Sequence, residues 1–124
     1  MDGDDDGRKA DPLIGTVRDG WTDLGIVEIN EGELRALEVD GHHVLLAKLK
    51  GTVSALDDMC NHAGCLLSGG WIDAKNGSVV CPCHEIEFDL RTGKNLTVPR
   101  LCEDQIALPL RLEAGRALVQ LGKR

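Results

Sequence analysis

Two short clusters of cysteine and histidine hold the side chains of this 124-residue chain that are best suited to chemistry. They are Cys60-Asn61-His62 and Cys81-Pro82-Cys83-His84. Thiolate and imidazole together are the ligands of zinc and of several iron sites. Attachment of haem would need Cys-x-x-Cys-His, whereas only one residue separates Cys81 from Cys83. The spacing therefore predicts a metal site, but these ligands alone do not name the metal.

Each cluster is accompanied by one further cysteine. Cys65 follows His62 by three residues, and Cys83 lies inside the second cluster. With these cysteines the two loops read C-x-H-x-x-C and C-P-C-H, which resembles the Rieske iron–sulfur family. The run from Phe88 to Gly93 is similar to the F-D-x-x-T-G of Rieske ferredoxins. The resemblance extends over about residues 21–121.

The resemblance implies a ligand set for a Rieske-type [2Fe–2S] cluster. Cys60 and Cys81 would hold one iron, and His62 and His84 would hold the other. Neutral imidazoles make the cluster less negative than four thiolates would, so it accepts an electron more readily. Rieske potentials accordingly lie at about −150 to +300 mV, against about −400 mV for plant-type ferredoxins. A zinc site with the same ligands is the alternative.

The resemblance also gives roles to the two extra cysteines. Cys65 and Cys83 match the disulfide between the loops in the quinol-oxidising branch of the family, and many low-potential Rieske ferredoxins lack this pair. We therefore expect a disulfide, with two reduced buried thiols as the alternative in a reducing cytosol. Cys102 has no evident partner and is interpreted as a small apolar residue.

The residues after the second cluster depart from the quinol-oxidising branch. That branch has glycine, serine and an aromatic hydroxyl where this chain has Glu85, Ile86 and Phe88. Hydroxyl donors to sulfur stabilise the reduced, more negative cluster, and neither Ile86 nor Phe88 can donate. A carboxylate at Glu85 adds negative charge. We therefore predict a reduction potential in the lower part of the Rieske range.

The composition excludes several classes of partner. The net charge of −7 argues against nucleic acid, which needs a basic surface, and against anionic membrane surfaces. An acidic electron carrier could be steered to a basic patch on a redox partner. No apolar run approaches the roughly 18 residues that span a bilayer, and residues 1–10 do not resemble a signal peptide. We expect a cytoplasmic protein with no membrane partner.

The turn signals along the chain are typical of an antiparallel all-β protein. Residues 1–20 are predicted to form an acidic flexible tail, and residues 21–124 one Rieske domain. Asp40-Gly41 predicts a hairpin turn between strands at 34–39 and 44–49, with His42 and His43 in that turn. Residues 106–112 alternate as a strand that Pro109 places at an edge or bulge. We expect a β-sandwich or small barrel with a cluster-binding subdomain inserted at about residues 58–89.

The chain shows no nucleophile–base pair and no glycine-rich nucleotide loop, so it is predicted to carry electrons rather than to catalyse a reaction. By resemblance, a Rieske ferredoxin takes electrons from a reductase and passes them to a terminal oxygenase. The alternatives are the small subunit of an NADH-dependent nitrite reductase, a soluble quinol-oxidase-type Rieske protein and a zinc-stabilised interaction module.

Overall fold

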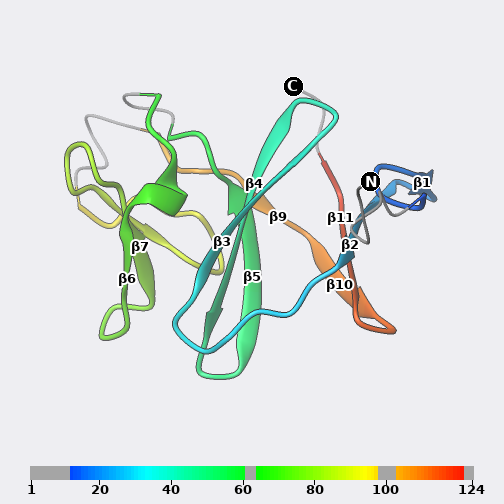
Figure 1. The fold of residues 1–124 in the computed structure, drawn as a ribbon. Helices are drawn as coiled ribbons and strands as arrows, with labels where there is room; N and C mark the ends of the chain where they lie inside the picture. Colours follow the sequence, from blue (N-terminus) through cyan, green and yellow to red (C-terminus); the bar gives the residue numbers. More distant parts are fainter. Residues whose placement is uncertain (1–11, 61–63, 98–102, 122–124) are drawn as a thin grey trace, which may run out of the picture.

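The computed structural model describes residues 12–60, 64–97 and 103–121, which form three antiparallel sheets (Figure 1). The first sheet has the order β1-β2-β11-β10 and the second the order β3-β4-β5-β9. The third sheet, β6-β7-β8, carries the second cysteine motif between β7 and β8, whereas the first motif lies between β5 and η2. The predicted all-β class is confirmed.

The strand bounds follow the turn signals closely. The first sheet comprises β1 (Val17–Arg18), β2 (Trp21–Ile26), β10 (Leu110–Glu113) and β11 (Arg116–Val119). The second comprises β3 (Leu34–Val39), β4 (His42–Leu49), β5 (Thr52–Asp57) and β9 (Ala107–Leu108). The third comprises β6 (Trp71–Asp73), β7 (Ser78–Val80) and β8 (Glu87–Asp89), preceded by a 3₁₀ turn, η2 (Leu67–Gly69). Within the described ranges, no helix has the length and apolar character needed to cross a bilayer.

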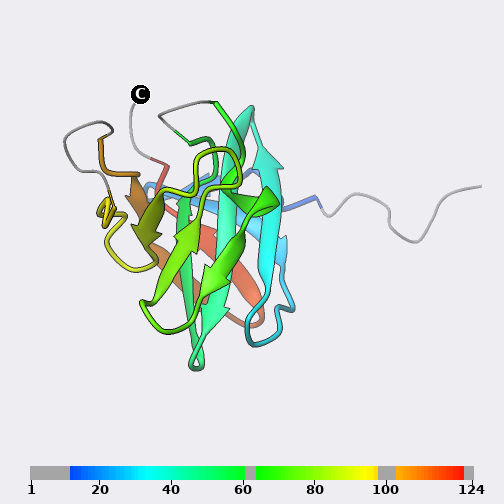
Figure 2. The ribbon, with the colours of Figure 1, turned by 90° about the vertical axis from the view of Figure 1, so that its left-hand side faces the viewer.

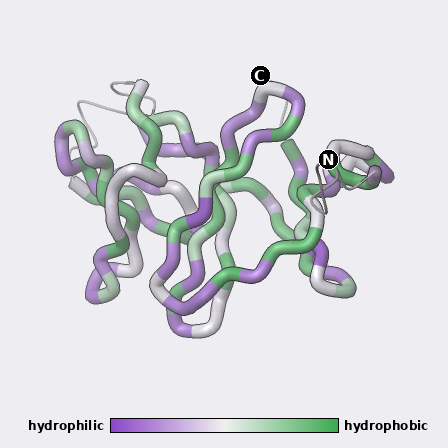
Figure 3. The backbone as a smooth tube through the Cα atoms, viewed as in Figure 1, coloured by the Kyte–Doolittle hydropathy of each residue, from purple (hydrophilic) through white to green (hydrophobic). Residues whose placement is uncertain are grey.

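The second sheet is the middle layer and is buried on both faces. Because successive side chains of a strand point to opposite faces, β4 supplies two cores at once. Val44 and Leu46 pack toward the first sheet, whereas Leu45 and Ala47 pack toward the cysteine loops. Figure 2 shows β6, β7 and β8 in front of this middle sheet, and Figure 3 shows how hydrophobic and hydrophilic residues alternate along the strands.

Phe88 is the centre of the core beneath the cysteine motifs. Ile86, Phe88 and Leu90 are 4%, 0% and 4% exposed, as the alternation along this strand predicts. The same core contains both Cys60 and Cys81. The packing of β8 therefore reaches directly to the two cysteines that lead the motifs.

Pro109 divides the strand that was expected over residues 106–112. β9 pairs with β5 in the middle sheet, whereas β10 pairs with β11 in the first sheet. Proline has no N–H to continue a ladder, so the chain changes sheets at this residue. As a result Ile106 and Leu112 are 46% and 56% exposed, which the regular alternation did not predict.

Two turns differ from the expectations in a way that backbone geometry explains. β4 begins at His42, because Asp40 and Gly41 alone form the turn with φ values of 49° and 78°. In the segment expected to be a flexible tail, residues 12–20 include β1, which pairs with β2 through a similar turn at Asp19 and Gly20. Residues 1–11 lie outside the described part.

A partly buried ion pair joins the two ends of the domain. Asp23 of β2 is 6% exposed, and its carboxylate accepts hydrogen bonds from Arg116 of β11 at 3.0 Å and from the Gly25 N–H at 2.8 Å. Burial alone would raise the pKa of Asp23. The hydrogen bonds from Arg116 and Gly25 and the charge of Arg116 outweigh burial, so the pKa of Asp23 lies below its usual value.

This pair predicts a pH-dependent contribution to stability. A lowered pKa means that Asp23 stabilises the fold above its unfolded pKa of about 3.9, and that this stabilisation is lost as the pH falls through the folded value. We expect Asp23→Asn to lower the free energy of unfolding by about 2 kcal/mol at pH 7. In denaturant titrations the difference from wild type should shrink below about pH 4. The exposed Glu28→Gln is the control, and a difference for Asp23→Asn that stays constant with pH would contradict the prediction.

Candidate metal centre

The two cysteine–histidine loops are closed by the same pair of backbone hydrogen bonds. In the first loop the Cys60 N–H donates to the Cys65 carbonyl at 2.7 Å, and the Cys60 carbonyl accepts from the Gly64 N–H at 3.0 Å. In the second loop the Cys81 N–H donates to the Ile86 carbonyl at 2.8 Å, and its carbonyl accepts from the Glu85 N–H at 2.8 Å. Each leading cysteine is therefore fixed by bonds to the residues four and five positions later.

This conformation requires a positive φ at the fourth position after each leading cysteine. Gly64 has a φ of 72° in the first loop, and Glu85 has a φ of 55° in the second. Glycine adopts this conformation without steric cost, whereas a residue with a Cβ does not. The sequence motif differs between the loops, but the closing hydrogen bonds and the positive φ at this position are the same.

The two leading cysteines are buried and the described histidine is not. Cys60 and Cys81 are 1% and 0% exposed and present thiols to the core around Phe88. His84 lies at the surface three residues after Cys81. His62 and Cys102 lie outside the described residues. The described donors thus place two sulfurs on the inner side and one imidazole, that of His84, on the outer side, which fits a binuclear cluster with unlike ends.

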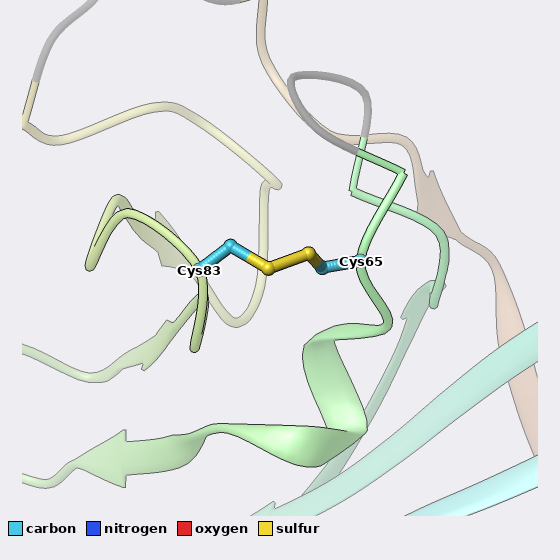
Figure 4. Close-up of a disulfide and its surroundings, with 2 residues drawn as sticks. All are labelled: Cys65 and Cys83. Carbon is cyan, nitrogen blue, oxygen red and sulfur yellow. A yellow bond between two sulfur atoms is a disulfide. The ribbon is translucent and has the colours of Figure 1, made fainter.

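A disulfide joins the two loops, as Figure 4 shows. It connects Cys65 to Cys83 with a Cα–Cα distance of 6.5 Å, so the pair that the resemblance implied is present and the alternative of two reduced thiols is not. Cys65 is the last residue of the first loop, and Cys83 lies beside His84. The disulfide therefore fixes the separation of the two loops at these positions.

Gln105 is a supporting residue that the sequence analysis missed. It is 5% exposed, and its side-chain amide donates to the Asp57 carbonyl at 2.8 Å and to the Met59 carbonyl at 2.5 Å, just before the first loop. Its backbone lies so close to Gly93 that a Cβ there would stand 2.0 Å from the Gln105 carbonyl oxygen. This contact explains the glycine of the Thr-Gly motif. A lone glutamine in a loop carries no sequence pattern that would have indicated its role.

A model of the Rieske [2Fe-2S] domain matches residues 22–109. The chain belongs to this family. It is 29% identical over 102 residues to the ferredoxin component of naphthalene 1,2-dioxygenase/salicylate 5-hydroxylase systems of Ralstonia sp., covering 82% of this chain and 95% of the relative.

Two solved structures resemble the fold of this Rieske chain. The ferredoxin of carbazole 1,9a-dioxygenase from Nocardioides aromaticivorans IC177 has a TM-score of 0.73 at 26% identity, covering 82% of this chain and 99% of the other. A putative NADH-dependent nitrite reductase small subunit from Mycobacterium tuberculosis has a TM-score of 0.70 at 25% identity, covering 84% and 96%. Together with the family match, these likenesses confirm the predicted Rieske-type [2Fe–2S] cluster and electron-carrier role.

The shared loop geometry predicts that Glu85→Gly stabilises the protein. Removing the Cβ relieves a conformational cost of about 1 kcal/mol at positive φ, although the unfolded chain gains some freedom. We expect a small rise in the apparent melting temperature of the Rieske protein, measured by the loss of its visible absorbance on heating.

The matched control is the reciprocal change in the first loop, Gly64→Ala. Within the described residues, and apart from its chain neighbours, no atom lies within 4 Å of the Cβ that this change adds, so the expected cost is conformational. We expect Gly64→Ala to lower the melting temperature by a similar amount. A fall for Glu85→Gly would show that the Glu85 side chain stabilises the second loop through contacts that outweigh its backbone cost.

The disulfide predicts a second effect, on retention of the cluster. Replacing Cys65 and Cys83 together by serine removes a cross-link over a sequence separation of 18, worth about 3 kcal/mol for a loop of this size. We expect faster release of iron to a chelator, followed by the bleaching of visible absorbance. A phosphine reductant should accelerate release from wild type and leave the double variant unchanged. Equal release rates for the two proteins would show that the disulfide does not hold the loops together.

Proposed function

We propose that this chain is the ferredoxin component of an oxygenase system, which passes single electrons from a reductase to a terminal oxygenase. The observation that carries the proposal is the asymmetry of the site. Two buried thiols and a surface imidazole lie in loops that a disulfide and the core hold in place. Ligands that move little between oxidation states favour rapid electron transfer.

We propose that Cys60 and Cys81 hold the inner iron and that His62 and His84 hold the outer iron. The buried positions of the two cysteines and the surface position of His84 support this assignment. When bound, the cluster supplies one-electron redox chemistry. The role of the polypeptide is to exclude water from the thiolates, to fix the two loops, and to present His84 toward a partner.

The same reasoning extends to the partners and to the organisation of the chain. The related ferredoxin of Ralstonia sp. serves dioxygenase and hydroxylase systems. The net charge of −7 suits a partner with a basic docking surface. We propose that the chain is an electron-transfer component rather than an enzyme in its own right, and that it works in the cytoplasm. Its cluster-binding subdomain spans about residues 58–89 within a domain of residues 21–124, and an acidic tail precedes this domain.

The nitrite reductase alternative has specific support from a structural likeness. The likeness to a nitrite reductase small subunit is almost as close in fold as that to the oxygenase ferredoxin. That alternative requires stable association with a large catalytic subunit, whereas a ferredoxin exchanges between two partners. The quinol-oxidising alternative has the disulfide in its favour, but the second loop lacks its hydroxyl donors, because Ile86 and Phe88 fill those positions in the core.

We expect a midpoint potential in the lower part of the range of about −150 to +300 mV. A spectroelectrochemical titration at pH 7 would measure it. The protein reduced in this way should then transfer one electron per chain to cytochrome c, a basic acceptor, in an anaerobic stopped-flow experiment. The rate should fall as ionic strength rises, because screening weakens the attraction between an acidic donor and a basic acceptor.

The potential separates the ferredoxin from the quinol-oxidising alternative. A potential well into the positive hundreds of millivolts would favour the quinol-oxidising alternative. Failure to transfer an electron, with the cluster intact, would contradict the proposed function.

A further inference from the structure

The two loops differ in how the chain closes them at their inner ends. The second loop is a hairpin, because β7 and β8 pair directly beneath it through Val80 and Glu87. The first loop leaves β5, whose neighbours are β4 and β9, and returns into η2 rather than into a strand paired with β5. Above this point only the isolated bridge between Met59 and Leu66 continues a ladder. The first loop therefore needs another closure at its base.

Asp58 supplies this closure with its side chain. Its backbone carbonyl accepts the Leu67 N–H at 2.7 Å as part of the bridge between Met59 and Leu66. One carboxylate oxygen accepts the Ser68 N–H at 2.7 Å, and the other accepts the Ser68 hydroxyl at 2.7 Å. The Asp58 N–H in turn donates to the His43 carbonyl at 2.9 Å, which ties the residue to β4.

These contacts also provide hydrogen-bond acceptors for the first backbone N–H groups of η2. The first N–H groups of a helical turn have no partner within the turn and need an acceptor from elsewhere. The residue in the cap position, Leu66, makes no side-chain hydrogen bond. Asp58 takes over that role from the other side of the loop, and η2 then buries Leu67 completely in the core that holds Cys60.

The contact between the Asp58 carboxylate and Ser68 lies in the interior of the protein rather than at its surface. Its relative exposure is 1%, and it lies two residues before Cys60. Burying a carboxylate costs free energy unless its hydrogen bonds are made. Loss of either partner should therefore destabilise the structure around it.

We propose that Asp58, acting through Ser68, is a positioning residue for the first ligand loop, which the disulfide at Cys65 ties to the second loop. The proposal rests on the proposed function for the identity of the ligands, but the contact itself belongs to this chain. Without the contact the loop keeps its tether at Cys65 and loses the fixed base from which Cys60 projects.

Hydrogen exchange and paramagnetic resonance test the proposal on the full-length protein with its cluster. We expect Asp58→Ala to accelerate amide exchange at Leu67 and Ser68 by at least tenfold, about 1.4 kcal/mol of local protection. It should also shift the g-values of the reduced protein, which report ligand geometry. Ser68→Ala removes only the hydroxyl and should give a smaller change in the same direction, and the double variant should equal Asp58→Ala.

The matched control is Asp73→Ala at the opposite end of the subdomain. The Asp73 carboxylate likewise accepts backbone N–H groups, from Lys75 at 3.0 Å and Asn76 at 3.2 Å, but it closes a turn that holds no cysteine. The Asp73→Ala variant should leave the g-values and the amide exchange at Leu67 and Ser68 unchanged.

Unchanged exchange or unchanged g-values in Asp58→Ala overturns the proposal. If Asp58→Ala does not fold or retain its cluster, Ser68→Ala decides by the same two readouts. Failure of the proposed function would instead appear as a wild-type protein that cannot pass its electron, with these differences between variants still present.

Discussion

The structure depends on an asymmetry of solvation at the ends of two loops. Bonds between iron and thiolate resist hydrolysis and oxidation when they are buried. A group that exchanges electrons with another protein must instead come near the surface. Cys60 and Cys81 are buried in the core around Phe88, and His84 lies outside it. The two loops that carry these residues are closed by the same pair of backbone hydrogen bonds and are joined by a disulfide.

The rest of the fold keeps that pair of loops in register. The middle sheet is buried on both faces, so β4 couples the core of the cysteine loops to the core beneath the first sheet. Pro109 moves the chain from one of these sheets to the other. Just before that transition Gln105 contacts the base of the first loop. Distant parts of the chain therefore stabilise the site through packing and a few buried hydrogen bonds.

The sequence predicted those features that follow from local chemistry. The spacing of Cys60 and Cys81 from the two histidines predicted a metal centre, and the family match supports a Rieske-type [2Fe–2S] cluster. The hairpin at Asp40-Gly41 was also predicted, and the structure pairs β3 with β4 there. Each of these signals is carried by a few adjacent residues, so no long-range contact had to be known.

The features that were missed depend on contacts between distant residues. Nothing near Asp58 marks it as the acceptor for a turn ten residues away, and an isolated glutamine does not indicate the contacts of Gln105. The shared loop conformation was hidden because Gly64 signals a positive φ and Glu85 does not. The exposure of Ile106 and Leu112 follows from the change of sheet at Pro109, which alternation alone cannot show.

The central claim is that thiolates bind the inner iron and imidazoles bind the outer one. Electron–nuclear double resonance on the reduced protein, with histidine labelled by ¹⁵N, tests it most directly. The account predicts couplings from two histidine nitrogens bound to the reduced cluster, one of which is lost in His84→Ala. A reduced spectrum without histidine couplings, or a colourless protein that holds one divalent ion per chain, would contradict it.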